Sequence, residues 1–353
     1  MPTEPLETDP ETGVQVYCLG ADERPADDIY GEQPYGDATG RRIVIRYFKK
    51  ETRPSGLSVI DLTDGARHDI LEGATPFPAF HAWGAEMWWN QKVDGKLLLR
   101  RCSFDTLQVQ DVCPLPAEMG SFSYGTVSPD NRYYAVSVTP PAGPPARVHV
   151  LDLQTGVWSL LLDKPGYHAK HEQFSRDGRN RVLIQLNQYP EVKQVLLGEL
   201  EIGGEAKMFP ADQPHTPRPT GHEAWIGDTA RIFFSCGFAS DKDGAIWTSQ
   251  VGDTAAKAVA PGNMRFGHVS VSRDGKYWIA DTGGEGVPIY IGSFASGAYK
   301  RAVCSRSVVT KDQSSHTHPY LTADNRWLIF NSTRDGHAQV YGARLADGWL
   351  NAL

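Results

Sequence analysis

Short apolar, β-branched runs alternate with polar turns along the whole chain, and this pattern recurs at a nearly constant interval. Seven segments join a turn of the Ser-x-Asp-Gly kind to a β-rich run, such as SRDGKYWIADT at 272–282 and the weaker copy DATGRRIVIRY at 37–47. Successive turns lie 45 to 51 residues apart, at Thr39, Gly84, Asp130, Asp177, Asp228, Asp274 and Asp324. This interval is that of one four-stranded propeller blade.

Seven blades account for nearly the whole chain, so we predict an all-β fold: one seven-bladed β-propeller domain spanning residues 1–353. Further strand signals follow the repeats, as in RVHVLDLQTG at 147–156. The stretch VQVYCLG at 13–19 precedes the first repeat, whereas the last repeat ends soon after its third strand. We therefore predict that this N-terminal strand completes the last blade and removes the exposed sheet edges.

Composition and charge exclude several classes of protein. The chain is 40% hydrophobic and 22% charged, with 35 Gly and 24 Pro, as expected for a soluble, turn-rich protein. The acidic N-terminus MPTEPLETDP lacks an apolar export segment and no run approaches membrane-spanning length, so we expect a cytoplasmic protein without a membrane partner. Five scattered cysteines without C-x-x-C spacing indicate reduced thiols. The net charge of −7 without a basic block argues against nucleic acid. The pattern does not predict an oligomeric state.

Histidines recur at one point of the repeat. Six residues before the seven turn positions stand Gln33, Pro78, Tyr124, His171, His222, His268 and His318. Four consecutive blades thus carry histidine at the start of the innermost strand, and we expect these side chains to gather at one mouth of the central channel. A shared structural duty in each blade is the alternative interpretation.

The stretch QSSHTHPY at 313–320 adds His316 to this group. In an extended chain alternate side chains share a face, so His316 and His318 would point the same way, with Gln313 within loop reach. Imidazole nitrogens and an amide oxygen suit a borderline divalent ion such as Mn²⁺ or Zn²⁺. We predict that His268, Gln313, His316 and His318 bind the metal, which leaves His222, one blade away, free to act as a base. H-x-H is also common on strands, where either histidine can simply bond to backbone.

The Q-x-x-H-x-H-P stretch, GHEAW at 221–225 and GHVSVSRDGKY at 267–277 resemble the oligogalacturonate lyases and their relatives. The resemblance covers essentially the whole ring and is specific in the last three blades. It implies a seven-bladed propeller with manganese bound by three histidines and a glutamine, here His268, His316, His318 and Gln313. It also implies that His222 is the base in a β-elimination on short uronic-acid chains.

One departure from the family concerns the substrate. The family carries an arginine upstream of the base, whereas the nearest equivalent in NQYPEVKQVLL at 187–197 is Lys193. A lysine supplies charge but not the flat, two-pronged contact to a carboxylate, so a uronate other than plain oligogalacturonate stays open. We expect the acidic oligosaccharide to contact Lys193 and Arg265 together with the ring residues His171 and Tyr124.

Other functions fit the sequence less well. A glycoside hydrolase needs two opposed carboxylates; Glu172 and Glu223 follow ring histidines, but in a strand they would point away from the channel. A serine peptidase of the α/β-hydrolase type needs G-x-S-x-G, which is absent from the sequence. The rival from another class is a non-catalytic binding or scaffold propeller, in which the histidines are structural. A lyase of the same mechanism with a different uronate-containing substrate is a further alternative.

Overall fold

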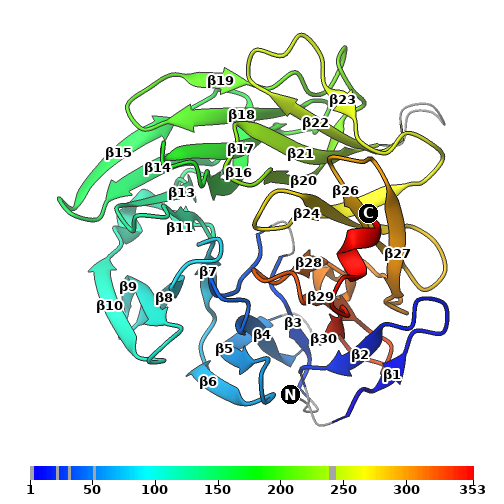
Figure 1. Cartoon of the computed structure of the whole chain (residues 1–353). Coiled ribbons are helices and arrows are strands. Elements are labelled where there is room, and N and C mark those ends of the chain that lie inside the picture. Colours follow the sequence, from blue (N-terminus) through cyan, green and yellow to red (C-terminus); the bar gives the residue numbers. More distant parts are fainter. Residues whose placement is uncertain (1–3, 21–23, 31–32, 51–52, 238–243) are drawn as a thin grey trace.

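The computed structural model describes residues 4–20, 24–30, 33–50, 53–237 and 244–353. Its strands form seven antiparallel sheets arranged around a central axis, so the predicted seven-bladed β-propeller is confirmed (Figure 1). Three short 3-10 helices accompany the strands: η1 (Ala117–Met119), η2 (Gln313–Ser315) and η3 (Trp349–Ala352). None of the helices in these ranges is long and apolar enough to cross a membrane.

Each blade runs outward from its innermost strand, which is named first for each blade below. Blade 1 consists of β3 (Ala26–Asp27), β4 (Arg42–Lys50), β5 (Arg53–Asp61) and β6 (Arg67–Glu72). Blade 2 consists of β7 (Phe77–Ala79), β8 (Glu86–Val93), β9 (Lys96–Ser103) and β10 (Val109–Pro114). Blade 3 has an inner strand split into β11 (Ser121–Phe122) and β12 (Thr126–Val127), followed by β13 (Tyr133–Thr139), β14 (Arg147–Asp152) and β15 (Val157–Leu162). Blades 4 and 5 consist of β16 (Tyr167–Phe174), β17 (Arg181–Gln188), β18 (Val195–Glu201) and β19 (Ala206–Met208); and β20 (Pro219–Trp225), β21 (Arg231–Cys236), β22 (Ile246–Gln250) and β23 (Lys257–Ala258). Blades 6 and 7 consist of β24 (Phe266–Val271), β25 (Tyr277–Thr282), β26 (Pro288–Ser293) and β27 (Tyr299–Cys304); and β28 (Tyr320–Leu321), β29 (Trp327–Ser332), β30 (Gln339–Arg344), β2 (Gln15–Cys18) and β1 (Glu7–Thr8).

The Ser-x-Asp-Gly repeat is the turn between the first and second strands of a blade. In blade 6 the Ser272 hydroxyl donates to Asp274 at 2.7 Å, and the same carboxylate oxygen accepts the Lys276 N–H at 3.1 Å. Gly275 adopts φ +70°, a left-handed conformation that glycine reaches without a steric cost. The side chains of the motif therefore fold the turn locally, which is why the motif recurs in sequence.

The N-terminal segment contributes the outer strands of the last blade (Figure 1). β2 pairs antiparallel with β30, with Val16 opposite Ala343 and Tyr17 opposite Gly342, and β1 adds a fifth strand outside it. Val16 is fully buried in a cluster shared by blades 6 and 7. The two ends of the chain thus meet in one sheet.

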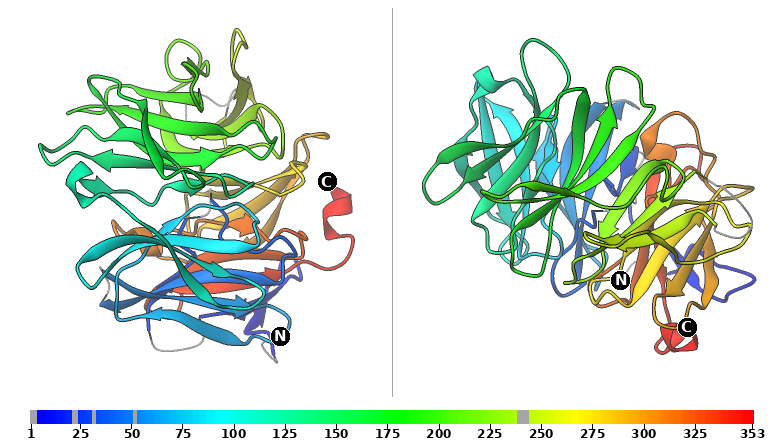
Figure 2. Two further views of the ribbon diagram at one scale, coloured as in Figure 1. Left: turned by 90° about the vertical axis from the view of Figure 1, so that its left-hand side faces the viewer. Right: turned by 90° about the horizontal axis from the view of Figure 1, so that it is seen from above.

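The apolar core is divided into seven clusters, each lying between two adjacent blades. The C-terminal η3 lies outside the ring, where Trp349 and Leu350 pack against the cluster of blades 6 and 7 (Figure 2). The Lys300 ammonium lies 3.8 Å from the centre of the Trp349 ring, which adds a cation–π contact. Each blade is therefore held mainly by its two neighbours.

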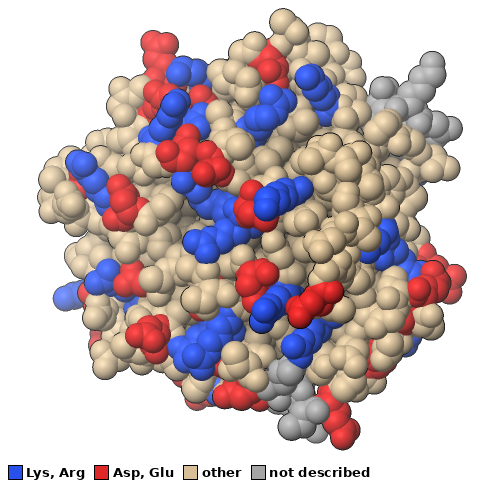
Figure 3. Space-filling view, in the orientation of Figure 1, with Lys and Arg blue, Asp and Glu red and all other residues tan. Residues whose placement is uncertain are grey.

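Acidic and basic side chains are interspersed over the face of the molecule seen in Figure 3. Ion pairs between acidic and basic side chains of the protein include Arg100 with Asp111 at 2.7 Å and Lys207 with Glu201 at 3.3 Å. The net negative charge is therefore not gathered into one patch on this face.

Candidate metal centre

The innermost strands of blades 4, 5 and 6 each carry a ring histidine beside a β-bulge. The register of β16, β20 and β24 with their partner strands shifts between Lys170 and Gln173, between Pro219 and Glu223, and between Phe266 and Val269. A bulge leaves a residue outside the hydrogen-bonded ladder and changes the direction of its side chain. The ladder is thus interrupted where the chain carries His171, His222 and His268.

His316 and His318 reach the centre from an irregular loop. The prediction that they lie in an extended segment with a shared face is wrong, because β28 begins only at Tyr320 and His318 adopts φ +39°. Asn331 fixes this loop: its backbone N–H donates to the Thr317 carbonyl at 2.8 Å, and its side-chain amide donates to the His316 carbonyl at 3.1 Å. The loop presents both imidazoles to the same point without a strand.

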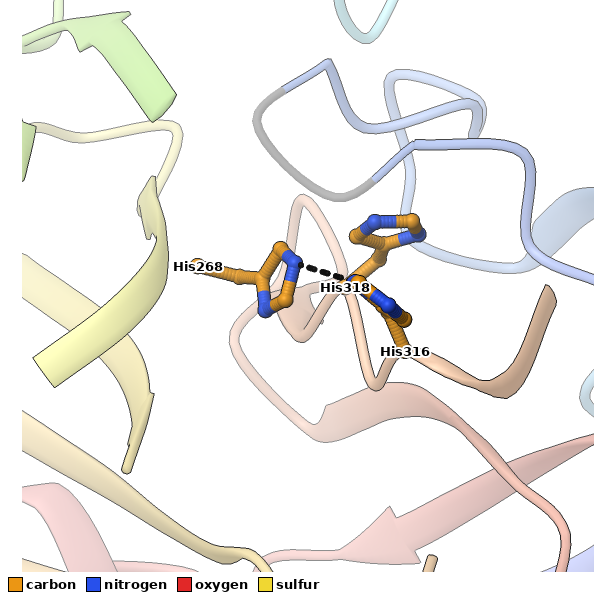
Figure 4. A group of neighbouring side chains, drawn as sticks. All are labelled: His268, His316 and His318. Atoms are coloured by element: carbon orange, nitrogen blue, oxygen red, sulfur yellow. Dashed lines mark hydrogen bonds between the residues drawn. The ribbon is translucent and has the colours of Figure 1, made fainter. Parts of the chain in front are cut away.

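The structure brings three of the four predicted metal ligands together. One ring nitrogen from each of His268, His316 and His318 lies within 4.8 Å of the other two, and the three imidazoles are turned toward one another (Figure 4). The shortest separation, 3.1 Å, joins Nε2 of His268 to Nδ1 of His316. Two nitrogens each about 2.1 Å from one ion and at right angles to each other would lie about 3 Å apart.

Hydrogen bonds on the far side of two of these rings assign their tautomers. Nδ1 of His268 lies 2.7 Å from Oδ2 of Asp281, and Nε2 of His316 lies 3.0 Å from the Thr310 carbonyl. Both partners are acceptors, so in the neutral rings these nitrogens carry the hydrogens, and the facing nitrogens of neutral His268 and His316 have lone pairs. Two lone pairs at 3.1 Å repel each other unless a cation lies between them. The arrangement fits a metal ion.

Asp281 anchors the centre from the neighbouring strand β25. Its other oxygen accepts the His268 backbone N–H at 2.8 Å, and the Thr317 hydroxyl donates to the carboxylate. Burial opposes ionisation of Asp281, but the charge that His268 carries when protonated, its hydrogen bonds and the bond from Thr317 outweigh it and lower the pKa of this carboxyl. An ionised Asp281 holds the His268 ring in the orientation that a ligand needs.

His318 is 1% exposed, and within the described ranges neither of its ring nitrogens has a hydrogen-bond partner. A buried, unpaired polar atom costs about 1–3 kcal/mol, so a bound cation would remove part of this cost. Burial above all, with the charges of His268 and His222, lowers the pKa of His318 well below its ordinary value. A neutral imidazole is the form that binds metal.

Gln313, the fourth predicted ligand, lies in η2, and its side chain is exposed. Asp312 caps this helix by accepting the Ser314 N–H at 3.2 Å. Gln313 thus lies at the start of η2, three residues before His316 in sequence. Its role as a metal ligand stays a prediction.

His222, the predicted base, packs beside the metal ligands. Its ring centre lies 4.3 Å from that of His268. Burial foremost, and then the charges of His268 and His171, lower the pKa of His222 well below its ordinary value. The imidazole is therefore neutral near pH 7 and able to accept a proton.

A cavity of about 320 Å³, the aromatic cavity, opens beside this centre. It brings together the predicted substrate residues Tyr124 and His171; its lining consists of Tyr30, Gln33, Phe77, Phe122, Ser123, Tyr124, Gly125, Lys170, His171 and Glu172. Buried Arg46 donates to the Tyr124 hydroxyl and forms a two-pronged pair with Asp27 at 3.0 and 2.6 Å. Arg46 is a cation at this mouth that the repeat does not reveal.

A second, polar cavity of about 370 Å³ shares Lys170 with the first; its lining consists of Lys170, Gln185, Asn187, Val192, Val195, Arg218, Pro219, Thr220 and Gly237. Lys193 follows Val192 but is 76% exposed and pairs with Glu191 at 3.0 Å. Arg265 is exposed and lies just before β24. Neither Lys193 nor Arg265 is among the described residues that line the two cavities. Their contact with substrate therefore stays a prediction.

The carboxylates of Glu172 and Glu223 are not turned away from the site as expected. Glu172 lines the aromatic cavity, and Oε1 of Glu223 lies 3.3 Å from Nδ1 of His171. The bulges explain the difference, because a strict alternation of side chains does not hold across them. Both residues are nearly fully buried, at 3% and 1% exposure.

Sequence patterns miss three residues of this site: Tyr30, Arg46 and Asp281. Asp281 pairs with His268 across the ladder between β24 and β25, thirteen residues away in sequence, so no local motif marks it. Tyr30 lies before the first repeat turn, yet its ring centre is 4.8 Å from that of His318. An inward-facing aspartate opposite a ring histidine is the signal that could have revealed Asp281.

No family model and no curated protein matches this chain in sequence. Among solved structures, an oligogalacturonate lyase from Vibrio parahaemolyticus has a TM-score of 0.77 at 16% identity, covering 97% of this chain and 96% of its own. An oligogalacturonate lyase in complex with manganese has a TM-score of 0.77 at 18% identity, covering 98% of this chain and 96% of its own. The β-propeller domain of the Trilobed protease from Pyrococcus furiosus is more distant, with a TM-score of 0.58 at 11% identity and coverage of 91% and 95%. The chain thus has the fold of the oligogalacturonate lyases over nearly its whole length, as its motifs predicted.

Proposed function

We propose that this protein is a metal-dependent lyase that cleaves short uronic-acid oligosaccharides by β-elimination and yields 4,5-unsaturated uronates. The observation that carries the proposal is the pair of lone-pair nitrogens on His268 and His316, 3.1 Å apart, beside the neutral ring of His222. The pair supports a cation site, and His222 supplies a proton acceptor next to it.

The proposed β-elimination requires both the cation site and the proton acceptor. Removing the proton next to a uronate carboxylate creates an enolate-like dianion, which forms only if the carboxylate charge is neutralised. A divalent ion such as Mn²⁺ or Zn²⁺ would be held by His268, His316, His318 and Gln313 and would supply that neutralisation as a Lewis acid. His222 takes the proton, and the bond from the sugar to the leaving oxygen then breaks. No covalent nucleophile is needed.

The shape and charge of the mouth favour a short acidic chain as substrate. The aromatic and polar cavities meet at Lys170, so adjacent sugar rings can lie on either side of one cation. Arg218 adds a second cation to the polar cavity. Lys193 directly follows Val192 of that cavity in sequence, and Arg265 shortly precedes His268. We infer that these residues offset the net negative charge of the protein where an acidic sugar binds.

A screen of short uronate oligosaccharides tests this proposal. The account predicts that absorbance from a conjugated double bond appears with di- or trisaccharides and added Mn²⁺. Mass spectrometry of the products separates elimination from hydrolysis, because only hydrolysis adds the mass of water. Products that carry added water would support a glycosidase. A protein that binds no metal and transforms none of these sugars would support the scaffold interpretation.

A further inference from the structure

The fourth ring histidine, His171, is not part of the metal cluster, and it lies between two other polar side chains. Its Nε2 is 3.4 Å from the Tyr30 hydroxyl, and its Nδ1 is 3.3 Å from Oε1 of Glu223. Resting on the proposed function, we propose that Tyr30 is the general acid that protonates the leaving sugar oxygen. His171 and Glu223 are the positioning residues: with the His171 Nδ1–H donated to Glu223, Nε2 accepts the Tyr30 hydroxyl and holds it in place. When substrate binds, the hydroxyl turns its hydrogen from His171 to the leaving oxygen.

Tyr30 occupies the boundary between the two halves of the site. Its ring centre lies 4.8 Å from that of His318 in the metal cluster and 6.2 Å from that of His222. The same side chain lines the aromatic cavity. A uronate bound at the metal and a neighbouring sugar in this cavity would be joined by a glycosidic oxygen close to Tyr30.

The backbone supports a role for His171 beyond packing. His171 adopts φ +62° beside the bulge of β16, a conformation that non-glycine residues rarely occupy. Glu223 comes from the next blade and is 1% exposed. A strained histidine anchored by a buried carboxylate from another blade has a defined orientation, as a positioning residue requires.

The step balances in protons and electrons. The bond between C5 and its hydrogen breaks, and His222 takes that proton. The electron pair left behind forms the C4–C5 double bond, and the bond from C4 to the glycosidic oxygen breaks. This oxygen takes the Tyr30 hydroxyl proton and leaves as an alcohol. Water then returns a proton to Tyr30 while His222 releases the one it took.

The test compares two leaving groups in Tyr30→Phe. The first substrate is digalacturonate, whose leaving alcohol needs a proton; the second is a galacturonate with a nitrophenoxy group at C4, which leaves without one. We expect kcat for digalacturonate to fall about 10²-fold or more, the scale of a general acid, and kcat for the nitrophenoxy substrate to stay near that of the wild type. Glu223→Gln should show the same contrast with a smaller loss.

Tyr299→Phe is the matched control, because it removes a hydroxyl from the outer strand β27 and should change neither rate. Thermal melting and metal content show whether each variant is folded and loaded. An equal loss on both substrates, or no loss on digalacturonate, would overturn the role of Tyr30 and leave the proposed function standing. A wild-type protein that eliminates neither substrate would overturn the proposed function itself.

Discussion

The histidines of this site differ in the neighbours that hold them. His268 is pinned by Asp281, His316 by the Thr310 carbonyl, and His318 has no hydrogen-bond partner within the described part of the chain. The partners of His268 and His316 determine which nitrogen of each of these two rings is available to a metal. The residues that surround the histidines, and not the histidines themselves, therefore set their different roles.

His316→Ala should abolish stoichiometric metal binding, because it removes one of the two facing lone pairs and leaves a weaker site. Elemental analysis of the purified protein measures this. His215→Ala, which removes an exposed histidine of another loop, should retain full metal content. Unchanged metal in His316→Ala would contradict the ligand assignment.

Asp281→Asn should weaken metal binding by about 10- to 100-fold, the usual scale for a residue that orients a ligand. The amide has the size of the carboxylate but lacks its charge, and it can donate to His268 where the carboxylate accepts. Competition with a chelator of known affinity measures the change. Affinity equal to that of the wild type would show that Asp281 does not orient His268.

His222→Ala should keep the fold and the metal while lowering turnover about a hundredfold or more, as expected for loss of a positioned base. Steady-state rates on the best uronate of the screen, with metal content measured on the same sample, check this. If activity is retained, the base lies elsewhere, and His171 is the next residue to test.

At this scale the sequence identifies the histidines but not their partners. The positions of the ring histidines follow from the repeat, because equivalent residues of successive blades lie at the same end of the channel. Asp281, Tyr30 and Arg46 were not identified as site residues because contacts between strands and between blades bring them there. Those contacts depend on register and on bulges, which leave no simple periodic signal.

At the scale of elements, the turns and the closing strand explain why the repeat can be recognised. The turn motif is local chemistry, since serine, aspartate and glycine form its bonds within five residues. Residues 316–319 show the limit of such reasoning, because a strand-like sequence there is an irregular loop. The tertiary bonds of Asn331 to this loop override its extended preference.

Val16→Asp should destabilise the protein strongly, because β2 buries this side chain between blades 6 and 7. An uncompensated buried charge costs about 3–5 kcal/mol. Gln15→Asp on the exposed face of the same strand is the matched control and should have little effect. Thermal melting of the two variants compares them. Equal melting temperatures would indicate that β2 does not hold the ring closed.

At the scale of the whole molecule, the ring turns seven separate interfaces into one site. Each apolar cluster joins only two blades, so no single core determines where the metal ligands lie. The site instead draws side chains from blades 1, 4, 5, 6 and 7 to one mouth. The sequence predicts the ring because its repeat is regular, whereas the substrate depends on loops between blades that do not repeat.

The most direct test of the central claim is the rate of double-bond formation from digalacturonate as metal is returned to stripped protein. The account predicts no activity in the stripped protein and a rise with added Mn²⁺ that levels off at one ion per chain. The same plateau should fail to appear in His316→Ala. Equal rates in stripped and metal-loaded protein would contradict the account.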